Sequence, residues 1–263
     1  MQFQIKLQVE NERPMLPLSY QYELSAWIYK VIENADANFA AFLHHQGYAT
    51  PERKAFKLFC FSQLHVPRFH IEGDRMCLDG KQVALLIGFY VDRTAEEFIR
   101  GLFGGQRFRL GDRLSQVEFS VQAVTPLHTS LPDEGTPVRL RTRSPVVIAR
   151  KRPDGGHDES LAPDDPAFSR LLFLNLIEKY RAATGRAIPT HWENASFLFR
   201  CVGTPPRSKL ITIKSGKAGQ TRVRGWIFDF ELLVPTQLLE LGLMAGFGRQ
   251  NSEGFGCAVL HQH

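Results

Sequence analysis

The stretch GFGRQNSEGFG, residues 246–256, places four glycines in eleven positions. Glycine loses more backbone entropy on folding than any other residue, so this density requires a structural reason. The stretch follows a predicted short helix, Pro235–Ala245, and precedes a predicted strand, Gly256–His261. Walker and dinucleotide-binding loops follow a strand and precede a helix, and the stretch contains neither GxxxxGK nor GxGxxG. It therefore predicts a helix-to-strand connection with unusual backbone angles, and no nucleotide triphosphate loop.

The first half of the chain is predicted as strand, helix, two strands, helix and strand. Gln2–Glu10 alternates apolar and polar side chains, as a half-buried strand does. Ser19 is expected to cap a helix, and Asp36 a further helical segment that ends at Gly47. A capping box at Thr94 opens the last helix. The other strands are predicted at Phe56–Leu64, at Arg68–Leu78 with a turn at Glu72-Gly73-Asp74, and at Gln116–Val124. This βαββαβ order is that of the ferredoxin-like unit found in RNA-recognition modules.

The same order of elements follows a segment rich in turn formers, residues 125–137. The predicted elements are strand Val138–Ala149, a helix from Asp165 to Gly185, strands Phe197–Val202, Lys209–Lys214 and Thr221–Leu233, and then the helix and strand around the glycines. No repeated sequence accompanies this repeated order. We therefore predict an α+β fold of two tandem ferredoxin-like (RRM-like) domains, residues 1–126 and 137–263, with a C-terminal glycine-rich loop.

Positive charge is concentrated in two parts of the chain, although the net charge is only +5. Residues 135–153 and 194–228 contain no acid. Segregated positive charge is typical of proteins that bind polyanions. The alternative is a set of solvated strand edges whose charges oppose aggregation. On the strand that begins at Val138, side-chain alternation places Arg139, Arg141 and Arg143 on one face.

The four cysteines lie far apart, and no two form a CxxC pair. This spacing predicts reduced core residues of a cytoplasmic protein and no structural zinc site. No apolar run approaches the roughly 20 residues that a membrane-spanning helix needs. The first residues alternate and include acids early, which indicates a strand and not a secretory signal. We expect a cytoplasmic protein with no membrane partner.

The glycine-rich stretch resembles the C-terminal signature of the CRISPR-associated repeat-RNA endoribonucleases, the Cas-six family of the RAMP superfamily. The family pattern is Gly-hydrophobic-Gly, five residues, Gly-hydrophobic-Gly. Here it reads Gly246-Phe247-Gly248, RQNSE, Gly254-Phe255-Gly256. The segments LSYQYELSAWIYKVI, FLHHQGY and SKLITIKSGKAGQTRVRGWIFDFEL are also similar to the family.

The resemblance implies cleavage of precursor CRISPR RNA within each repeat, without a metal or a cofactor. The 2′-OH upstream of the scissile phosphate would attack it, leaving a 2′,3′-cyclic phosphate and a 5′-OH. A catalytically inactive RNA-binding subunit of a CRISPR effector complex is the alternative, and a general RNA chaperone is a weaker one. The implied partners are precursor and mature CRISPR RNA and effector-complex subunits. The repeat, its hairpin or single-stranded form, the CRISPR subtype and dimerisation stay open.

The implied catalytic residues lie in the first 54 residues. His44 stands in His-x-x-Gly before Gly47, as in the family, and histidine suits proton transfer because its pKa lies near neutrality. His45 is the backup, because adjacent helical residues point about 100° apart. Tyr29 is implied as a hydrogen-bond donor, because a phenol with a pKa of about 10 is a poor base. Lys54 is the nearest lysine for a cationic role, although the family's lysine follows the histidine more closely.

Each catalytic assignment has a plainer alternative. The two histidines could face solvent at a frayed helix end, and Tyr29 could lie at the core margin. The remaining basic and loop residues are expected to bind RNA, whereas Phe247 and Phe255 are expected to pack beneath the loop. The expected RNA-binding residues are Arg139, Arg141, Arg143, Arg207, Lys209, Lys214, Lys217, Arg222, Arg224, Gly246, Gly248, Arg249, Gln250, Asn251, Gly254 and Gly256.

Overall fold

The structure is a computed structural model that describes residues 1–52, 54–91, 95–128, 130–152, 155, 158–193 and 197–261. Of His44, His191 and Glu193 it describes the backbone only. Within these ranges no helix is both long enough and apolar enough to cross a membrane.

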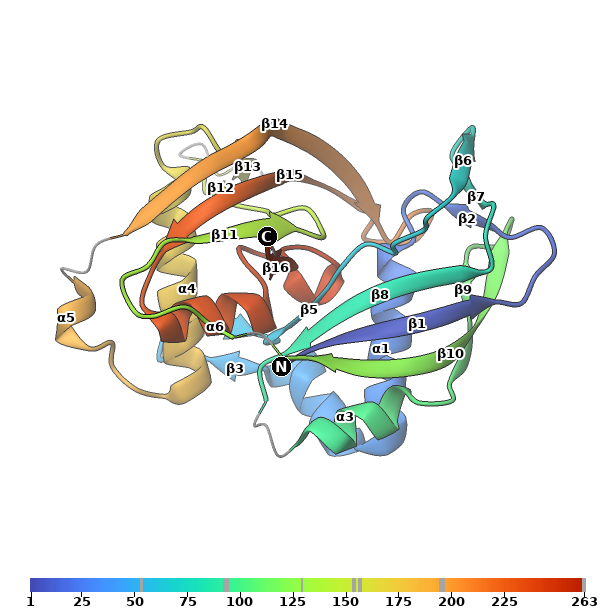
Figure 1. Ribbon diagram of the computed structural model, residues 1–263, viewed down its shortest axis with the longest axis horizontal. Coiled ribbons are helices and arrows are strands. Elements are labelled where there is room, and N and C mark those ends of the chain that lie inside the picture. The colour runs from blue at the N-terminus through green and yellow to red at the C-terminus, as the bar shows by residue number, and fades with distance from the viewer. Residues whose placement is uncertain are drawn as a thin grey trace.

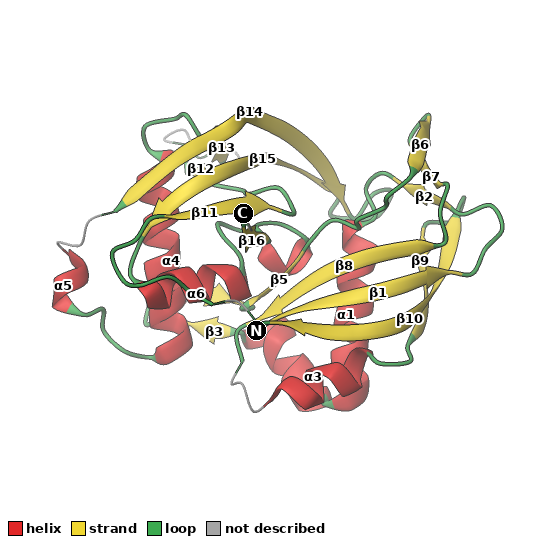
Figure 2. Ribbon diagram, viewed as in Figure 1, coloured by secondary structure: helices red, strands yellow, loops and turns green. Residues whose placement is uncertain are grey.

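Two antiparallel sheets, each covered on one face by helices, form the molecule (Figures 1 and 2). The first sheet has the order β5 (Phe59–Phe61), β8 (Gln82–Phe89), β1 (Gln2–Val9), β10 (Gln116–Leu127) and β9 (Arg107–Gly111). The second has the order β14 (Leu198–Ile213), β15 (Thr221–Leu233), β11 (Val138–Thr142) and β16 (Ala258–Leu260). In each sheet the first strand in sequence lies between the third and fourth strands of a βαββαβ unit. The prediction of two ferredoxin-like units is confirmed.

Two helices pack on each sheet because their apolar stripes face it. The first core joins β1, β8 and β10 to α1 (Gln21–Ala35) and α3 (Glu96–Phe103). The second core joins β11 and β15 to α4 (Phe168–Thr184) and α6 (Thr236–Ala245). Two predicted helix ends are confirmed. Asp36 caps α2 (Ala37–Ala41) by accepting a hydrogen bond from the Phe39 amide at 2.9 Å, and Gly185 ends α4 with a φ of 65°.

The third strand of the first unit was predicted wrongly. It is β8, whose sequence QVALLIGF is mostly buried, and not Arg68–Leu78. Those residues form the hairpin of β6 (Phe69–Glu72) and β7 (Arg75–Leu78) around the turn predicted at Glu72-Gly73-Asp74. The hairpin pairs with β2 (Met15–Pro17) as a separate small sheet. The remaining short strands are β3 (Tyr48–Ala49), β4 (Ala55–Phe56), β12 (Ala149–Arg150) and β13 (Glu159–Ser160), and the remaining short helix is α5 (Thr190–Glu193).

The predicted cap at Ser19 is also wrong. Helix α1 begins after Tyr20 without a side-chain cap. The Ser19 hydroxyl instead accepts a hydrogen bond from the Thr212 amide of β14 at 3.3 Å. The predicted capping box at Thr94 lies outside the described residues.

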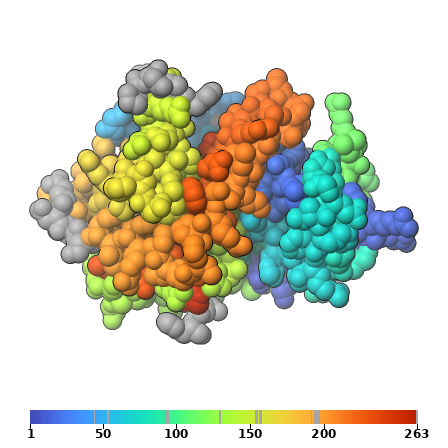
Figure 3. Space-filling model, turned by 90° about the horizontal axis from the view of Figure 1, so that it is seen from above, coloured from blue at the N-terminus to red at the C-terminus, as the bar shows by residue number. Residues whose placement is uncertain are grey.

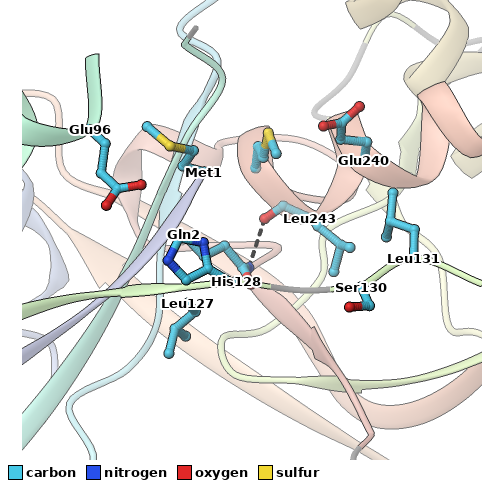
Figure 4. Close-up of a pocket in the computed structure, with 10 residues that line it drawn as sticks. Met1, Gln2, Glu96, Leu127, His128, Ser130, Leu131, Glu240 and Leu243 are labelled. Carbon is cyan, nitrogen blue, oxygen red and sulfur yellow. Dashed lines mark hydrogen bonds between the residues drawn. The ribbon is translucent and has the colours of Figure 1, made fainter. Parts of the chain in front are cut away.

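The two halves are joined along a seam near the chain's first strand. The Gln2 amide nitrogen donates to Leu243 O and to Ala258 O, both at 2.8 Å, and Figure 4 shows the first of these bonds. The β14–β15 hairpin bridges the halves a second time. Its surface runs from the second half toward the first in Figure 3, and the ammonium groups of Lys214 and Lys217 lie over the Tyr22 ring of α1 at 5.9 and 4.8 Å. The division at residues 126 and 137 stays a prediction.

Candidate active site

The glycine-rich loop, residues 246–256, is the connection from α6 to β16, as predicted. Its four glycines have φ angles of 86°, 75°, 90° and 75°, a region that favours glycine. They are also buried and lack room for a side chain. A Cβ on Gly248 would lie 2.4 Å from Val147 O, and one on Gly256 would lie 2.0 Å from Phe247 O. The glycines are therefore required both by the backbone angles and by close packing.

Buried side chains beneath the glycine-rich loop hold it in place: Phe247 belongs to the second core, and Phe255 packs in a separate cluster with Val147 and β14. Phe247 and Phe255 are fully buried, which confirms their predicted position. Asn251 donates from its amide nitrogen to Phe247 O at 3.2 Å and to Phe255 O at 3.1 Å. Asn251 was predicted to bind RNA, but its side chain is buried and committed to the loop. The side chains of the loop that remain accessible are Arg249, Gln250, Ser252 and Glu253.

A buried lysine completes the support of the loop. Lys179 of α4 is only 1% exposed. Its ammonium donates to Gly246 O at 2.5 Å, to Gly248 O at 2.9 Å and to the Asn251 side-chain oxygen at 2.7 Å. Three loop oxygens therefore meet the three N–H donors of one ammonium group.

Helix α1 contacts the same loop from the first half. The Ser25 hydroxyl donates to Ser252 O at 2.7 Å. One turn along α1, the half-buried Tyr29 packs edge-on against Phe59, with ring centroids 5.4 Å apart. Burial raises the pKa of Tyr29, and a hydrogen bond with the Ser252 side chain partly offsets that rise. Tyr29 is therefore protonated at neutral pH and is placed at the loop.

The predicted histidines lie on a π-helix, Phe42–Gln46, which ends at Gly47. Gly47 has a φ of 62°, and a Cβ there would lie 2.6 Å from Phe56 O and 3.5 Å from Lys57 Cδ. The glycine lets the π-helix end directly against β4, which explains why position 47 is occupied by glycine. The His44 side chain lies outside the described part of the chain, and His45 is exposed.

A hollow of about 220 Å³ separates β4 and β5 from the glycine-rich loop. Its walls include Phe56 and Lys57, which touch Gly47, and Phe59 and Ser252, which touch Tyr29. The hollow therefore lies beside both the tyrosine and the π-helix. We call it the loop pocket. Its lining residues are 54–59, Asn175, Lys179 and 248–252.

Two lysines at the loop pocket differ in their surroundings. Lys54 was predicted as the cationic residue, and its ammonium forms an ion pair with Glu178 of α4. Lys57 lies three residues later, and burial lowers its pKa. Both reach the pocket, but Lys57 is the one that packs against Gly47.

Sequence reasoning missed Asn175 and Lys179, although their positions carried a signal. Both fall on the buried face of α4, which also contains Phe168, Leu172 and Leu176. Polar residues at such positions require partners. Lys179 has three, whereas no described residue donates to the buried side-chain oxygen of Asn175.

Comparison with known proteins identifies the family. Residues 15–125 match the family description "CRISPR-associated protein Cas6, N-terminal", and residues 129–260 match "CRISPR associated protein Cas6, C-terminal". The chain belongs to the Cas6 family. The glycine-rich loop and the two ferredoxin-like units are therefore those of a Cas6 protein.

Individual relatives agree along the whole chain. CRISPR-associated endoribonuclease Cas6 1 of Methanocaldococcus jannaschii is 28% identical over 98% of this chain and 92% of its own length. CRISPR-associated endoribonuclease Cas6 of Pyrococcus furiosus is 27% identical over 97% of this chain and 88% of its own. A solved structure titled "CRISPR associated protein Cas6" superposes with a TM-score of 0.71 at 26% identity, over 100% of this chain and 99% of that one.

The arginines predicted on the first strand of the second unit share one exposed face of this Cas6 chain. Arg139 and Arg141 alternate with buried neighbours on β11, and Arg143 follows directly. The Arg141 guanidinium is held by Asp229 through contacts of 2.9 to 3.2 Å. Arg141, Arg143 and His261 line a hollow of about 320 Å³ that also reaches Gln4 of the first sheet. Arg141 and Arg143 therefore face the first sheet, and none of the three arginines lines the loop pocket.

The basic residues of the β14–β15 hairpin are all exposed. Arg222 and Arg224 line a second hollow, of about 1010 Å³, together with Arg249 and Gln250 of the loop. Because Arg249 and Gln250 also line the loop pocket, the two hollows adjoin across the loop. Arg249 forms an ion pair with Asp158 there. The other predicted RNA-binding residues of the hairpin lie on β14 (Arg207 and Lys209) and in the turn (Lys214 and Lys217).

One hollow and one side-chain cluster that contain acidic residues lie away from the loop pocket. A hollow of about 530 Å³ at the seam contains the carboxylates of Glu96 and Glu240 (Figure 4), which makes it unsuited to phosphates. Within the described ranges, donor atoms of His70, Glu72 and Cys77 converge within 4.8 Å on the β6–β7 hairpin. None of these three residues lines the loop pocket. The absence of a metal from catalysis stays a prediction.

Proposed function

We propose that this protein is a metal-independent endoribonuclease that cleaves precursor CRISPR RNA within its repeats. The observation that carries the proposal is a pocket lined by the glycine-rich loop in a Cas6 chain, whose wall residue Ser252 bonds to Tyr29 and whose wall residue Phe56 lies against Gly47, where the π-helix of His44 ends. Two relatives along its length are named CRISPR-associated endoribonucleases. The products are a 2′,3′-cyclic phosphate and a 5′-OH.

The reaction requires proton transfer and stabilisation of a developing negative charge. His44 is proposed to move the protons, since a positioned histidine contributes roughly 10²–10⁴-fold to such a step. Tyr29, protonated and bonded to the loop, is proposed to donate a hydrogen bond to the scissile phosphate. Fixed donors and cations in a partly dry site stabilise such charge more than they would in water.

Lys57 is proposed as the cationic residue in place of Lys54. Lys57 packs against Gly47, which ends the π-helix of His44. Lys54 also lines the pocket, but its charge is engaged by Glu178. Lys54 would then bind RNA phosphate once that ion pair opens.

RNA is proposed to cross the glycine-rich loop from the β14–β15 hairpin to the loop pocket. Support comes from the adjoining hollows, which share Arg249 and Gln250. The buried glycines hold the loop flat against the core, and direct contact falls to the exposed side chains. Lysines and arginines that neutralise phosphates release counterions, so affinity should fall steeply with salt. A log–log slope near zero would contradict this path.

The test is cleavage of repeat RNA in EDTA by the wild-type protein, His44→Ala and His45→Ala. We expect the wild type and His45→Ala to cleave, and His44→Ala to lose activity by roughly 10²–10⁴-fold while keeping RNA affinity. Abolition of cleavage by EDTA would overturn metal independence, and the reverse ranking of the two histidines would reassign the base. A comparison of Lys57→Ala with Lys54→Ala locates the cation, because only the catalytic one should lower kcat.

We also propose binding partners and a cellular location for this protein. Binding of precursor and mature CRISPR RNA follows from the reaction, and contact with effector-complex subunits and self-association are proposed as further partners. A cytoplasmic location is supported by the four free cysteines, since thiols stay reduced there.

A further inference from the structure

Lys179 is a buried charge whose hydrogen-bond partners all belong to the glycine-rich loop. The lysine lies 67 to 72 residues before its three acceptors in the sequence. Within the described part of the chain no carboxylate forms an ion pair with it. The contacts therefore connect α4 to the loop and to nothing else.

Burying this ammonium is unfavourable, which calls for a compensating role. A charge removed from water costs free energy unless hydrogen bonds replace its hydration. Burial lowers the pKa of Lys179 to about 7, and nearby Lys54 lowers it further while the Cys60 thiol acts in the opposite direction. Methionine has a similar length and would fill the same space without this cost. The ammonium is thus explained by its three donors and not by packing.

The three acceptors bracket the accessible part of the loop. Gly248 and Asn251 lie on either side of Arg249 and Gln250, the two residues shared by the adjoining hollows. Gln250 has a φ of 57°, which is unfavourable for a residue with a side chain. Such a conformation persists only where its surroundings determine it. The hydrogen bonds from Lys179 fix the loop on both sides of Gln250 and so maintain its backbone conformation.

The hydrogen bonds of Lys179 also affect the position of the proposed catalytic tyrosine. Asn251 is followed by Ser252, whose carbonyl accepts from Ser25 and whose side chain bonds to Tyr29. A shift of Asn251 would therefore move the hydrogen-bond partner of the proposed catalytic tyrosine. Displacements of about 1 Å can cost roughly 10²-fold in rate.

We propose that Lys179 is a positioning residue for RNA cleavage: its three hydrogen bonds hold residues 246–251 so that Arg249 and Gln250 meet the RNA and Ser252 orients Tyr29. The inference rests on the proposed function. Lys179 acts through the loop and does not touch the RNA.

The test uses the full chain with Lys179→Met, which keeps the apolar stem and removes the ammonium. Cleavage of repeat RNA in EDTA is followed under multiple- and single-turnover conditions, with hydrogen exchange of the free protein. We expect KM to rise, kcat to fall and kcat/KM to drop by roughly 100-fold, with amide protection lost in residues 246–256 only. Lys81→Met, an exposed lysine in the β7–β8 turn, is the matched control and should match the wild type.

Each outcome decides a different point. If the wild type leaves repeat RNA intact, the proposed function and this inference both fail. If the wild type cleaves and folded Lys179→Met has the same KM and kcat, the inference alone is overturned, even when the melting temperature falls. If Lys179→Met does not fold, Lys179→Gln replaces it. Its neutral amide offers two donors, so its kcat/KM should still fall below that of the wild type, and equality would overturn the inference.

Discussion

The same connection occurs twice in this fold, once in each ferredoxin-like unit, and the two copies are built differently. In the first unit, α3 leads to β10 through Gly104, Gly105 and β9. Gly105 has a φ of 67°, yet a Cβ there would meet nothing within 4 Å. In the second unit, α6 leads to β16 through the glycine-rich loop, where every framing glycine is buried and a Cβ would lie within 3.0 Å of another atom.

The difference separates two uses of glycine. Gly105 is needed for the direction of the chain, as in any tight turn. The loop glycines are needed for that and for contact, because the Phe61 ring, the Val147 carbonyl and the Asn251 amide occupy the space a side chain would fill. Topology therefore does not account for the glycine-rich loop. The groups packed around it do.

The largest effect should come from filling that space. Gly256→Ala would place a methyl group 2.0 Å from Phe247 O and 2.4 Å from the Asn251 amide nitrogen, at a φ of 75°. We expect a loss of more than ~4 kcal/mol in the free energy of unfolding, since clash and backbone strain act together. Gly105→Ala should cost about 1 kcal/mol, from the backbone angle alone. Chemical denaturation of both variants is the measurement, and equal losses would remove the distinction between the two connections.

The next largest effect should come from Asn251→Ala. The substitution removes two donors to loop carbonyls and one acceptor from Lys179, all buried. We expect a loss of about 2–4 kcal/mol, because each buried partner left unsatisfied costs about 1–3 kcal/mol and neighbouring terms overlap. Asn34→Ala, at an exposed position of α1, is the control. A loss below that of the control would mean that the loop is held by its glycines alone.

Lys179 holds the connection in the second unit and Asp112 holds the one in the first. Because the two groups have opposite charge, the stability that each contributes should change differently with pH. Burial lowers the pKa of Lys179 to about 7, below its unfolded value. The unfolded chain therefore binds more protons above pH 7, and the free energy of unfolding should rise with pH there by at most ~1.4 kcal/mol per pH unit. The difference between the wild type and Lys179→Met, measured from pH 6 to pH 9, should contain this rise. A pH-independent difference would contradict it.

The smallest effect belongs to the first connection. Asp112, in the β9–β10 turn, accepts from the Leu114 and Ser115 amides at 2.9 and 3.0 Å and from Arg75 at 2.6 Å. Partial burial raises its pKa, but these hydrogen bonds together outweigh burial and hold the pKa below its ordinary value. The stabilisation is therefore present above pH 4 and is lost as pH falls through the folded-state pKa.

We expect Asp112→Asn to cost less than ~1 kcal/mol at pH 7, because the carboxylate is partly exposed and screened. The cost should shrink as the pH falls through the folded-state pKa, because the wild-type carboxylate then becomes protonated in both states. Urea denaturation of the wild type and Asp112→Asn at pH 7 and pH 2 is the measurement. A cost that persists in acid would assign the effect to shape and not to charge.

Local patterns were enough to predict most of the fold. The alternation of Gln2–Val9, the stripe of α4 and the turn at Gly185 each depend on neighbours in sequence. β8 was missed because a short apolar run such as VALLIGF shows neither the two-residue period of a half-buried strand nor the 3.6-residue period of an amphipathic helix. The turn predicted within Arg68–Leu78 is confirmed, but the two strands beside it belong to a separate small sheet and not to the ferredoxin-like unit.

The candidate site was predictable only in part. The glycine pattern and the His44-to-Gly47 spacing are linear signals, and the buried positions of Phe247 and Phe255 follow from their chemistry. The support of the loop by Lys179 and the ion pair of Lys54 with Glu178 depend on contacts between segments more than 60 residues apart. No local pattern carries that information, although polar residues on the buried stripe of α4 indicated that partners existed.

The hydrogen bonds of Gln2 have a consequence for synthesis. One residue near the start of the chain closes on Leu243 and Ala258, 241 and 256 residues later. At ~5–20 residues per second, roughly 13–50 s separate the translation of Gln2 from that of Ala258. During that interval β1 can pair with β8 and β10. The Gln2 end of β1, however, lacks its hydrogen-bond partners in the second unit until the ribosome has synthesised them. The contact between the two units is therefore complete only after β16 has been synthesised.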